Sequence, residues 1–424
     1  MADEPEFAPV SRRAFLRSGA LALVSLGLDP LFVARAAFAR EASAGVGGRR
    51  VLVCLFQRGA VDGLNMIVPH GDSAYYRERP RIAIPRDQVL DLDGRFGFHP
   101  ALESLLPLWK QGTLAAVHAV GSPDVTRSHF DAQDYMESGT PGVKSTRDGW
   151  LNRHARHAQE HRDTPFQSVA FGPQLPRILA GSAPALAISD LRAFGIRAPQ
   201  GGSRDRLTRA FEELYEASAT GIVASSAAEG FEAVATLKRL KLEDYRPEHG
   251  AAYPDGRLGR SLRQIAQLIK ADLGVENAFA DVGGWDTHIA QGASKGQLGT
   301  RLRELGDSLA AFAQDLGDRM RDVVVLTMSE FGRTVAENGS GGTDHGHGTA
   351  MLVMGGGVRG GRIQGRWPGL DSEHRFQGRD LAVTTDFRDL FGEILVRHCG
   401  ATRLDAVFPG HTGSASHFPG VLAG

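Results

Sequence analysis

Four short apolar runs stand out along the chain, at residues 50–56, 114–120, 323–328 and 350–354. They contain few polar positions and no regular polar alternation, which is typical of strands that are covered on both faces. Apolar residues recur at helical spacing between these runs, in residues 100–111, 257–273, 296–320 and 387–398. The alternation of strand and helix predicts an α/β fold, a doubly wound and mostly parallel sheet flanked by helices.

The middle of the chain, residues 150–270, has a mostly helical pattern that includes expected helices at 205–217 and 228–240. Two short strand candidates, residues 168–172 and 185–188, interrupt this pattern. We interpret the region as a helical elaboration inside one domain that spans residues 49–424.

The N-terminus resembles a sorting signal. Residues 11–16, SRRAFL, match a twin-arginine export motif, residues 19–33 are modestly apolar, and residues 37–39, AFA, fit a small-x-small cleavage site. A membrane anchor is the alternative, but the uninterrupted apolar run is too short to cross a bilayer. We therefore expect a signal peptide over residues 1–39, a glycine-rich linker over 40–48, and no stable membrane span after cleavage. The expected partner is the twin-arginine export machinery, and the expected location is periplasmic or extracellular.

The composition limits the classes of partner that the chain can bind. A formal net charge of −1 over 424 residues provides no global field for nucleic acid or an anionic membrane, so an anionic substrate must be met by local charge. The two cysteines, Cys54 in an expected strand and Cys399 near the end of an expected helix, favour packed thiols over a disulfide.

The loop between the runs 323–328 and 350–354 concentrates side chains of the metal-ligand type. Ligand sites in open α/β sheets form where loops leave the carboxyl ends of strands, and glycines in this loop allow side chains to crowd one point. A hydrogen-bonded polar loop without a metal is the alternative. The four candidates are Glu330, Asp344, His345 and His347.

A second pair, Asp286 and His288, follows another expected strand. A carboxylate and an imidazole two residues apart can converge on one ion, and this ligand mixture suits zinc, manganese or iron better than calcium. We expect a divalent cation, zinc or manganese. The alternative is a surface turn in which Asp286 caps the next helix.

A helix is expected to begin after the segment TRSH, with Thr126 or Ser128 as its cap. A serine at a helix N-terminus is also placed to act as a nucleophile in phosphoryl or sulfuryl transfer, because the helix amides favour the anion. Arg127 and His129 beside it could clamp or protonate an anionic group. Capping alone is the competing interpretation.

Several segments together resemble a bacterial twin-arginine-exported family of unknown function, domain of unknown function 1501, over nearly the whole chain. They include RRAFLRSGA, QRGAVDGLNMIVPHGDSAYYRERPRIAIP, TRSHFDAQDYMESG, GWDTH and SEFGRTVAENGSGGTDHGHG. That family is in turn distantly similar to the alkaline phosphatase and sulfatase superfamily. The resemblance implies a doubly wound sheet with metal ligands at the strand ends.

Site roles are implied residue by residue. Ser128 or Thr126 falls at the nucleophile of the superfamily, Asp286 and His288 fall at its first metal pair, and His345 or His347 falls at its late histidine.

Two positions depart from the superfamily pattern. The segment MSEFG, residues 328–332, stands where the superfamily has Ser-Asp-His-Gly, so Glu330 can ligate and Phe331 cannot. Asp62 is a displaced substitute for the aspartate that ends the opening strand. One metal site is therefore better matched than two.

The resemblance implies an exported metal-dependent hydrolase of phosphate or sulfate esters, with a Ser/Thr nucleophile, an Asp/His metal site and a small anionic ester as substrate. The altered metal positions leave an alternative from a different class. In that alternative the chain is a non-catalytic exported binding or assembly protein that retains a degenerate phosphatase-like fold.

Overall fold

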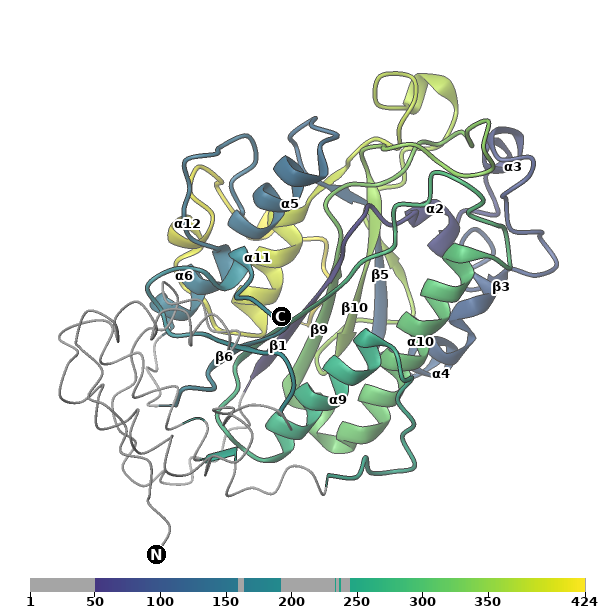
Figure 1. Cartoon of the computed structure of the whole chain (residues 1–424). Coiled ribbons are helices and arrows are strands. Elements are labelled where there is room, and N and C mark those ends of the chain that lie inside the picture. Colours follow the sequence, from purple (N-terminus) through teal and green to yellow (C-terminus); the bar gives the residue numbers. More distant parts are fainter. Residues whose placement is uncertain (1–49, 159–163, 192–232, 234–235, 238–244, 424) are drawn as a thin grey trace, which may run out of the picture.

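A nine-stranded sheet forms the centre of the protein (Figure 1), seen in a computed structural model that describes residues 50–158, 164–191, 233, 236–237 and 245–423. The order of the main path is β11-β5-β10-β9-β1-β8-β6-β7, and β12 pairs with β5. The strands are β1 (Val51–Gln57), β5 (Leu114–Gly121), β6 (Ser168–Phe171), β7 (Leu186–Ile188), β8 (Asn277–Val282), β9 (Val323–Met328), β10 (Thr349–Gly355), β11 (Ile363–Gln364) and β12 (Thr385–Asp386).

The sheet is mostly parallel. β1 pairs in parallel with β8 on one side and β9 on the other, so that Cys54 lies opposite Phe279 and Leu326. Among the described strands of this sheet, β10 alone is antiparallel to its neighbours, β5 and β9. The predicted α/β fold with a mostly parallel sheet is confirmed.

Helices cover both faces of the sheet, which explains why its strands are apolar without alternation. Along β1, Val51, Val53 and Leu55 pack into one core cluster and the intervening residues into another. The first cluster includes residues of α9 (Arg257–Lys270) and α10 (Gln297–Leu316), and the second includes residues of α6 (Trp150–His157) and α11 (Phe387–Arg397). In Figure 1 these helix pairs lie on opposite sides of the sheet.

One short helix begins near the carboxyl edge of the sheet. α5 (His129–Ser138) begins after β5, with Ser128 as its N-cap and Gly139 in the left-handed conformation at its end. The Ser128 hydroxyl accepts the Asp131 N–H, which satisfies one of the free amides of the first turn. The predicted cap is confirmed, and it makes His129 the first residue of the helix.

The remaining elements are short. A separate sheet has the order β2-β4-β3, from Ile67–Val68, Gly97–Phe98 and Leu90–Asp91. The other helices are α2 (Gly63–Met66), α3 (Ser73–Glu78), α4 (Leu106–Lys110) and α12 (Leu404–Val407), with 3-10 turns at Pro100–Leu105, Arg177–Leu179, Gly317–Asp322, Ser372–His374 and Ala415–His417.

The middle region, residues 150–270, adds β6 and β7 to the edge of the main sheet and α9 to one of its faces. The helix expected at 205–217 and most of that expected at 228–240 lie outside the described residues, as do the signal peptide 1–39 and the linker 40–48. Within the described ranges, no helix is both long enough and apolar enough to cross a membrane.

Cys54 and Cys399 are free thiols, as predicted, and burial raises the pKa of Cys399 to about 12.

Two buried histidines, His118 and His398, are held in the neutral form. The His118 ring accepts the Ala119 N–H at Nδ1 and donates from Nε2 to the Ile67 carbonyl, while His398 Nε2 donates to the Val51 carbonyl. Burial lowers the pKa of each ring from 6.5 to about 4. The folded state therefore disfavours a proton that the unfolded chain binds readily.

We predict that this pair makes the fold sensitive to acid. Because the folded pKa is depressed, the stabilisation is complete above pH 6.5 and is lost as the pH falls towards 4. Urea unfolding in EDTA should give a lower midpoint at pH 5 than at pH 7.5, and His118→Gln should reduce that difference. An equal fall in wild type and variant would contradict this assignment, and His417→Gln, at an exposed histidine, is the control.

Candidate metal centre

Three chain segments that are distant in sequence meet at the carboxyl edge of the main sheet. The turn after β5 brings His129, the loop after β8 brings Asp286 and His288, and the long loop from β9 to β10 brings His345. Because β5, β8 and β9 run in the same direction, their carboxyl ends lie at one edge. This is the edge at which open α/β sheets place their ligand sites.

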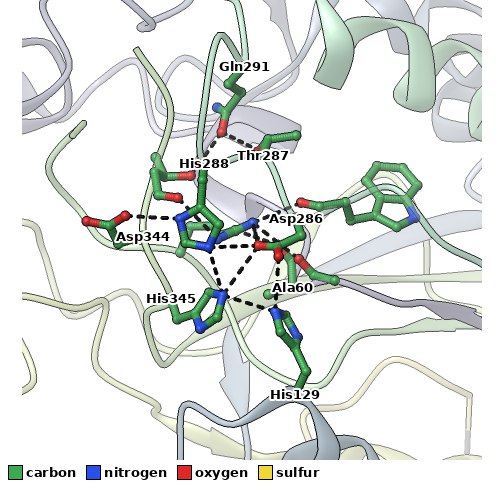
Figure 2. A network of polar contacts seen from close by, with 12 residues as sticks. Ala60, His129, Asp286, Thr287, His288, Gln291, Asp344 and His345 are labelled. Atoms are coloured by element: carbon green, nitrogen blue, oxygen red, sulfur yellow. Dashed lines mark hydrogen bonds and ion pairs between the residues drawn. The ribbon is translucent and has the colours of Figure 1, made fainter. Parts of the chain in front are cut away.

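The ligand atoms of His129, Asp286 and His345 all lie within 4.8 Å of one another. His345 Nε2 is 3.0 Å from His129 Nε2 and 3.3 Å from Asp286 Oδ1, and His129 Nε2 is 3.5 Å from Asp286 Oδ2. Figure 2 shows these side chains pointing towards one another. Two imidazole nitrogens and a carboxylate at such spacing have the size and the chemistry of a divalent metal site.

His288 extends this group. Its Nε2 lies 2.9 Å from His345 Nε2 and 3.0 Å from Asp286 Oδ1 (Figure 2). The His288 ring therefore borders the group formed by His129, Asp286 and His345. We use the name histidine cluster for His129, Asp286, His288 and His345.

Each imidazole of the histidine cluster is oriented from behind by an acceptor at Nδ1. A carboxylate or a carbonyl oxygen carries no hydrogen, so each Nδ1 must donate, and the lone pair of each Nε2 is then directed into the cluster. Metal-ligating histidines are typically held in this way. The three pairs are His129 with Glu330 Oε1 at 2.7 Å, His288 with Asp344 Oδ1 at 3.0 Å, and His345 with the Arg127 carbonyl at 2.9 Å.

Asp286 is ionised in this setting. Burial alone would raise its pKa, but the charge and hydrogen bond of Arg333, together with the charges of His288 and His129, hold the pKa below its ordinary value. The Arg333 guanidinium is fully buried and also donates to the Ala60 carbonyl at 2.9 Å and the Thr343 carbonyl at 3.1 Å. Arg333 therefore fixes the carboxylate and ties the loop after β8 to the loop after β1 and to its own β9–β10 loop.

The rings of the cluster differ in proton affinity. A hydrogen bond to Glu330 raises the pKa of His129, whereas burial lowers the pKa of His345. Glu330 itself is buried, which would raise its pKa, yet donors from His129, Gln133 and the Gly59 amide bring it below the ordinary value. The negative charge behind His129 increases the basicity of this ring as a ligand.

Strained backbone accompanies the site. Ala60, whose carbonyl accepts from Arg333, has φ of 62°, and Ala290, two residues after His288, has φ of 47°. Residues other than glycine seldom adopt this left-handed region, and such strain is concentrated at functional sites.

The structure brings together only part of the predicted ligand set. Asp286, His288 and His345 converge, and Asp344 and Glu330 stand one step behind as acceptors of histidine Nδ1 protons. Glu330 and Asp344 therefore contact the outer side of two cluster histidines and are not among the residues whose ligand atoms converge.

Two other predicted ligands point elsewhere. The buried Asp62 carboxylate accepts from Arg79 at 2.7 Å and from Gln291 at 2.6 Å, so its charge is already matched. The buried His347 ring stacks on Phe376 with centroids 4.3 Å apart. Of the two late histidines, His345 enters the cluster and His347 does not.

The predicted catalytic residues also separate. His129 is a member of the cluster rather than a free acid or base, and Arg127 contributes its carbonyl while its guanidinium pairs with Asp380 at 2.6 Å. Ser128 is exposed and caps α5, and the Thr126 hydroxyl accepts the Ser128 N–H at 3.2 Å.

Gln133 is a supporting residue that the sequence interpretation missed. Its Nε2 donates to Glu330 at 2.8 Å and its Oε1 accepts from Arg58 at 3.0 Å. The available signal was its position four residues after His129, because residues i and i+4 share one face of a helix.

The chain shows low similarity to several solved structures. No curated protein sequence matches it. Similar solved structures include the C-terminal periplasmic domain of EcEptC from Escherichia coli in complex with zinc (9% identity, 77% of each chain, TM-score 0.34) and a protein in the alkaline phosphatase superfamily from Vibrio parahaemolyticus (10% identity, 81% of this chain and 70% of that chain, TM-score 0.30). A third is the phosphonate monoester hydrolase of Agrobacterium radiobacter (10% identity, 85% and 78%, TM-score 0.32). Similarity this low transfers no residue or activity to the chain.

The family comparison is more extensive. The family described as "Protein of unknown function (DUF1501)" matches residues 49–402, which include every element of the main sheet and the whole histidine cluster. The sequence resemblance to this family is confirmed, and the chain belongs to it.

Proposed function

We propose that this protein is an exported hydrolase of phosphate or sulfate esters that depends on a divalent metal, zinc or manganese. The observation that carries the proposal is the direction of the imidazole rings. Three acceptors fix the Nδ1 protons, so three Nε2 lone pairs and the Asp286 carboxylate face one another. Such an arrangement brings like lone pairs together and is favourable when a cation lies between them.

The donor set fits a borderline cation. His129, Asp286 and His345 would hold it, and His288 would complete or border its coordination. Nitrogen with one carboxylate suits zinc and manganese and is unlike the oxygen-only shell of calcium. When bound, such a cation polarises the oxygens of a phosphoryl or sulfuryl group and offsets their negative charge.

The chain's own residues supply the remaining roles. Ser128 is the proposed nucleophile, because the residue is exposed, directly precedes a proposed ligand and is the N-cap of α5. Thr126 holds the turn through the Ser128 N–H. Arg127 and Arg379, with side chains 31% and 46% exposed, both pair with Asp380, and Arg379 also donates to the His345 carbonyl at 2.6 Å. The three groups together leave one positive charge beside the cluster for an anionic substrate.

The first prediction concerns metal content. His129→Ala and Asp286→Ala should each remove a proposed ligand and abolish stoichiometric zinc or manganese in purified protein, measured by elemental mass spectrometry. Glu330→Gln keeps the ligands but removes the charge behind His129, so it should weaken affinity by about 10- to 100-fold in a chelator competition. His417→Ala is the matched control at an exposed histidine. A wild-type protein that takes up no metal after re-metallation would refute the proposed centre and favour the non-catalytic binding or assembly alternative.

The second prediction concerns the nucleophile. Ser128→Ala should reduce kcat for phosphate or sulfate ester hydrolysis by at least about a thousandfold while leaving metal content unchanged, because a bound ion cannot replace the attacking oxygen of the chain. Thr126→Ala should lower stability slightly and keep most activity. If Ser128→Ala retains full activity on an ester that wild type hydrolyses, Ser128 only caps α5.

The third prediction concerns export. We propose that residues 1–39 direct the folded chain through the twin-arginine machinery to the periplasm or beyond, because they carry the motif around Arg12 and Arg13 and a fitting cleavage site. Replacing both arginines with lysine should leave an uncleaved precursor in the cytoplasm in a cell-fractionation immunoblot. Normal processing and export of that variant would argue against the motif.

A further inference from the structure

Three large apolar residues that are close in sequence to members of the histidine cluster are exposed to solvent. Phe130, Ile289 and Val125 are 91%, 66% and 52% exposed. Phe130 directly follows His129, Ile289 directly follows His288, and Val125 precedes Arg127, the residue whose carbonyl orients His345, by two positions. The segment from Val125 to the first turn of α5 and the loop after β8 therefore present apolar surface next to proposed metal ligands in sequence.

The concentration of these side chains is more informative than their number. Single exposed apolar residues are ordinary on protein surfaces. Among the described residues, five large apolar side chains are exposed, and three of them are the ones beside the cluster. The other two are Val143, in the loop after α5, and Val396, on α11.

Local packing does not account for Phe130. The buried side of α5 is formed by Ala132, Tyr135 and Met136 together with the end of the helix, and Phe130 is not part of it. Phe130 lies three residues before Gln133, on the side of the helix that reaches Arg58 and Glu330. A solvent-exposed aromatic ring next to a proposed metal-binding residue is suited to contact a substrate bound at that metal.

We infer that the site takes amphiphilic esters, in which an anionic phosphoryl or sulfuryl group at the histidine cluster is joined to an apolar chain that contacts Phe130 and Ile289. This inference rests on the proposed function and adds the substrate class to it. The two halves of such a molecule match the two kinds of surface present: metal ligands with Arg127 and Arg379 for the anion, and apolar side chains beside them for the chain.

The inference is tested with two alkyl phosphates that share one headgroup. Calorimetric titration of the zinc-loaded full chain should show hexyl phosphate binding at least about tenfold more tightly than ethyl phosphate, because four additional methylene groups leave water at least in part. Release of inorganic phosphate from both compounds is measured on the same protein.

Variants identify the surface that produces the preference. Phe130→Ser combined with Ile289→Ser should reduce hexyl phosphate binding to the level of ethyl phosphate and leave ethyl phosphate binding and zinc content unchanged. Both side chains are exposed, so folding should not suffer. Val396→Ser, at an exposed apolar residue on α11, is the matched control and should keep the preference.

Three results would overturn the inference: equal binding of the two esters, no binding of either, or a preference that survives the double variant. If the double variant keeps the preference but no longer sediments with vesicles of phosphatidylethanolamine and phosphatidylglycerol, the apolar residues contact a membrane instead. Zinc uptake and phosphate release without a preference for hexyl phosphate would refute this inference and leave the hydrolase proposal standing. A preference for hexyl phosphate without phosphate release would refute the hydrolase proposal and leave the binding of amphiphilic esters standing.

Discussion

The candidate site depends on the hydrogen bonds that three histidines donate from Nδ1. Without an acceptor behind it, an imidazole can turn either nitrogen towards its neighbours. Here Glu330, Asp344 and the Arg127 carbonyl each take one Nδ1 proton, which directs the opposite nitrogens into one space. Because the acceptors belong to different loops from the rings they hold, the arrangement exists only when the sheet edge is assembled.

Two buried side chains, Arg333 and Gln291, keep those loops in place. Arg333 joins the Asp286 carboxylate to carbonyls from two other loops. Below it, Gln291 donates to Asp62 at 2.6 Å and accepts from the Thr343 hydroxyl at 2.9 Å. Breaking one partner of a buried pair leaves an uncompensated charge, so such residues preserve geometry even where they never touch a ligand.

Much of the frame follows from the sequence in physical terms. Continuous apolar runs identified strands covered on both faces, and the cap at Ser128 fixed where α5 begins. The direction of the loop side chains could not be predicted from the sequence. The spacing of His345 and His347 is compatible with either ring facing the cluster, and the choice is made by backbone contacts such as the one from Gly346 N–H to the Gly332 carbonyl at 2.8 Å. A side chain at Gly346 would meet the Arg333 backbone, so the approach requires glycine there.

The same limit explains Glu330 and Asp344. Both have the residue type of a ligand. Only the folded chain reveals that each carboxylate accepts the Nδ1 proton of a cluster histidine. The central claim, that imidazoles rather than these carboxylates hold the ion, is tested most directly by X-ray absorption at the zinc edge of the metal-loaded protein. The account predicts nitrogen and oxygen neighbours at about 2.0–2.1 Å with the outer-atom scattering of at least two imidazole rings. A spectrum of oxygen neighbours without imidazole scattering would contradict it.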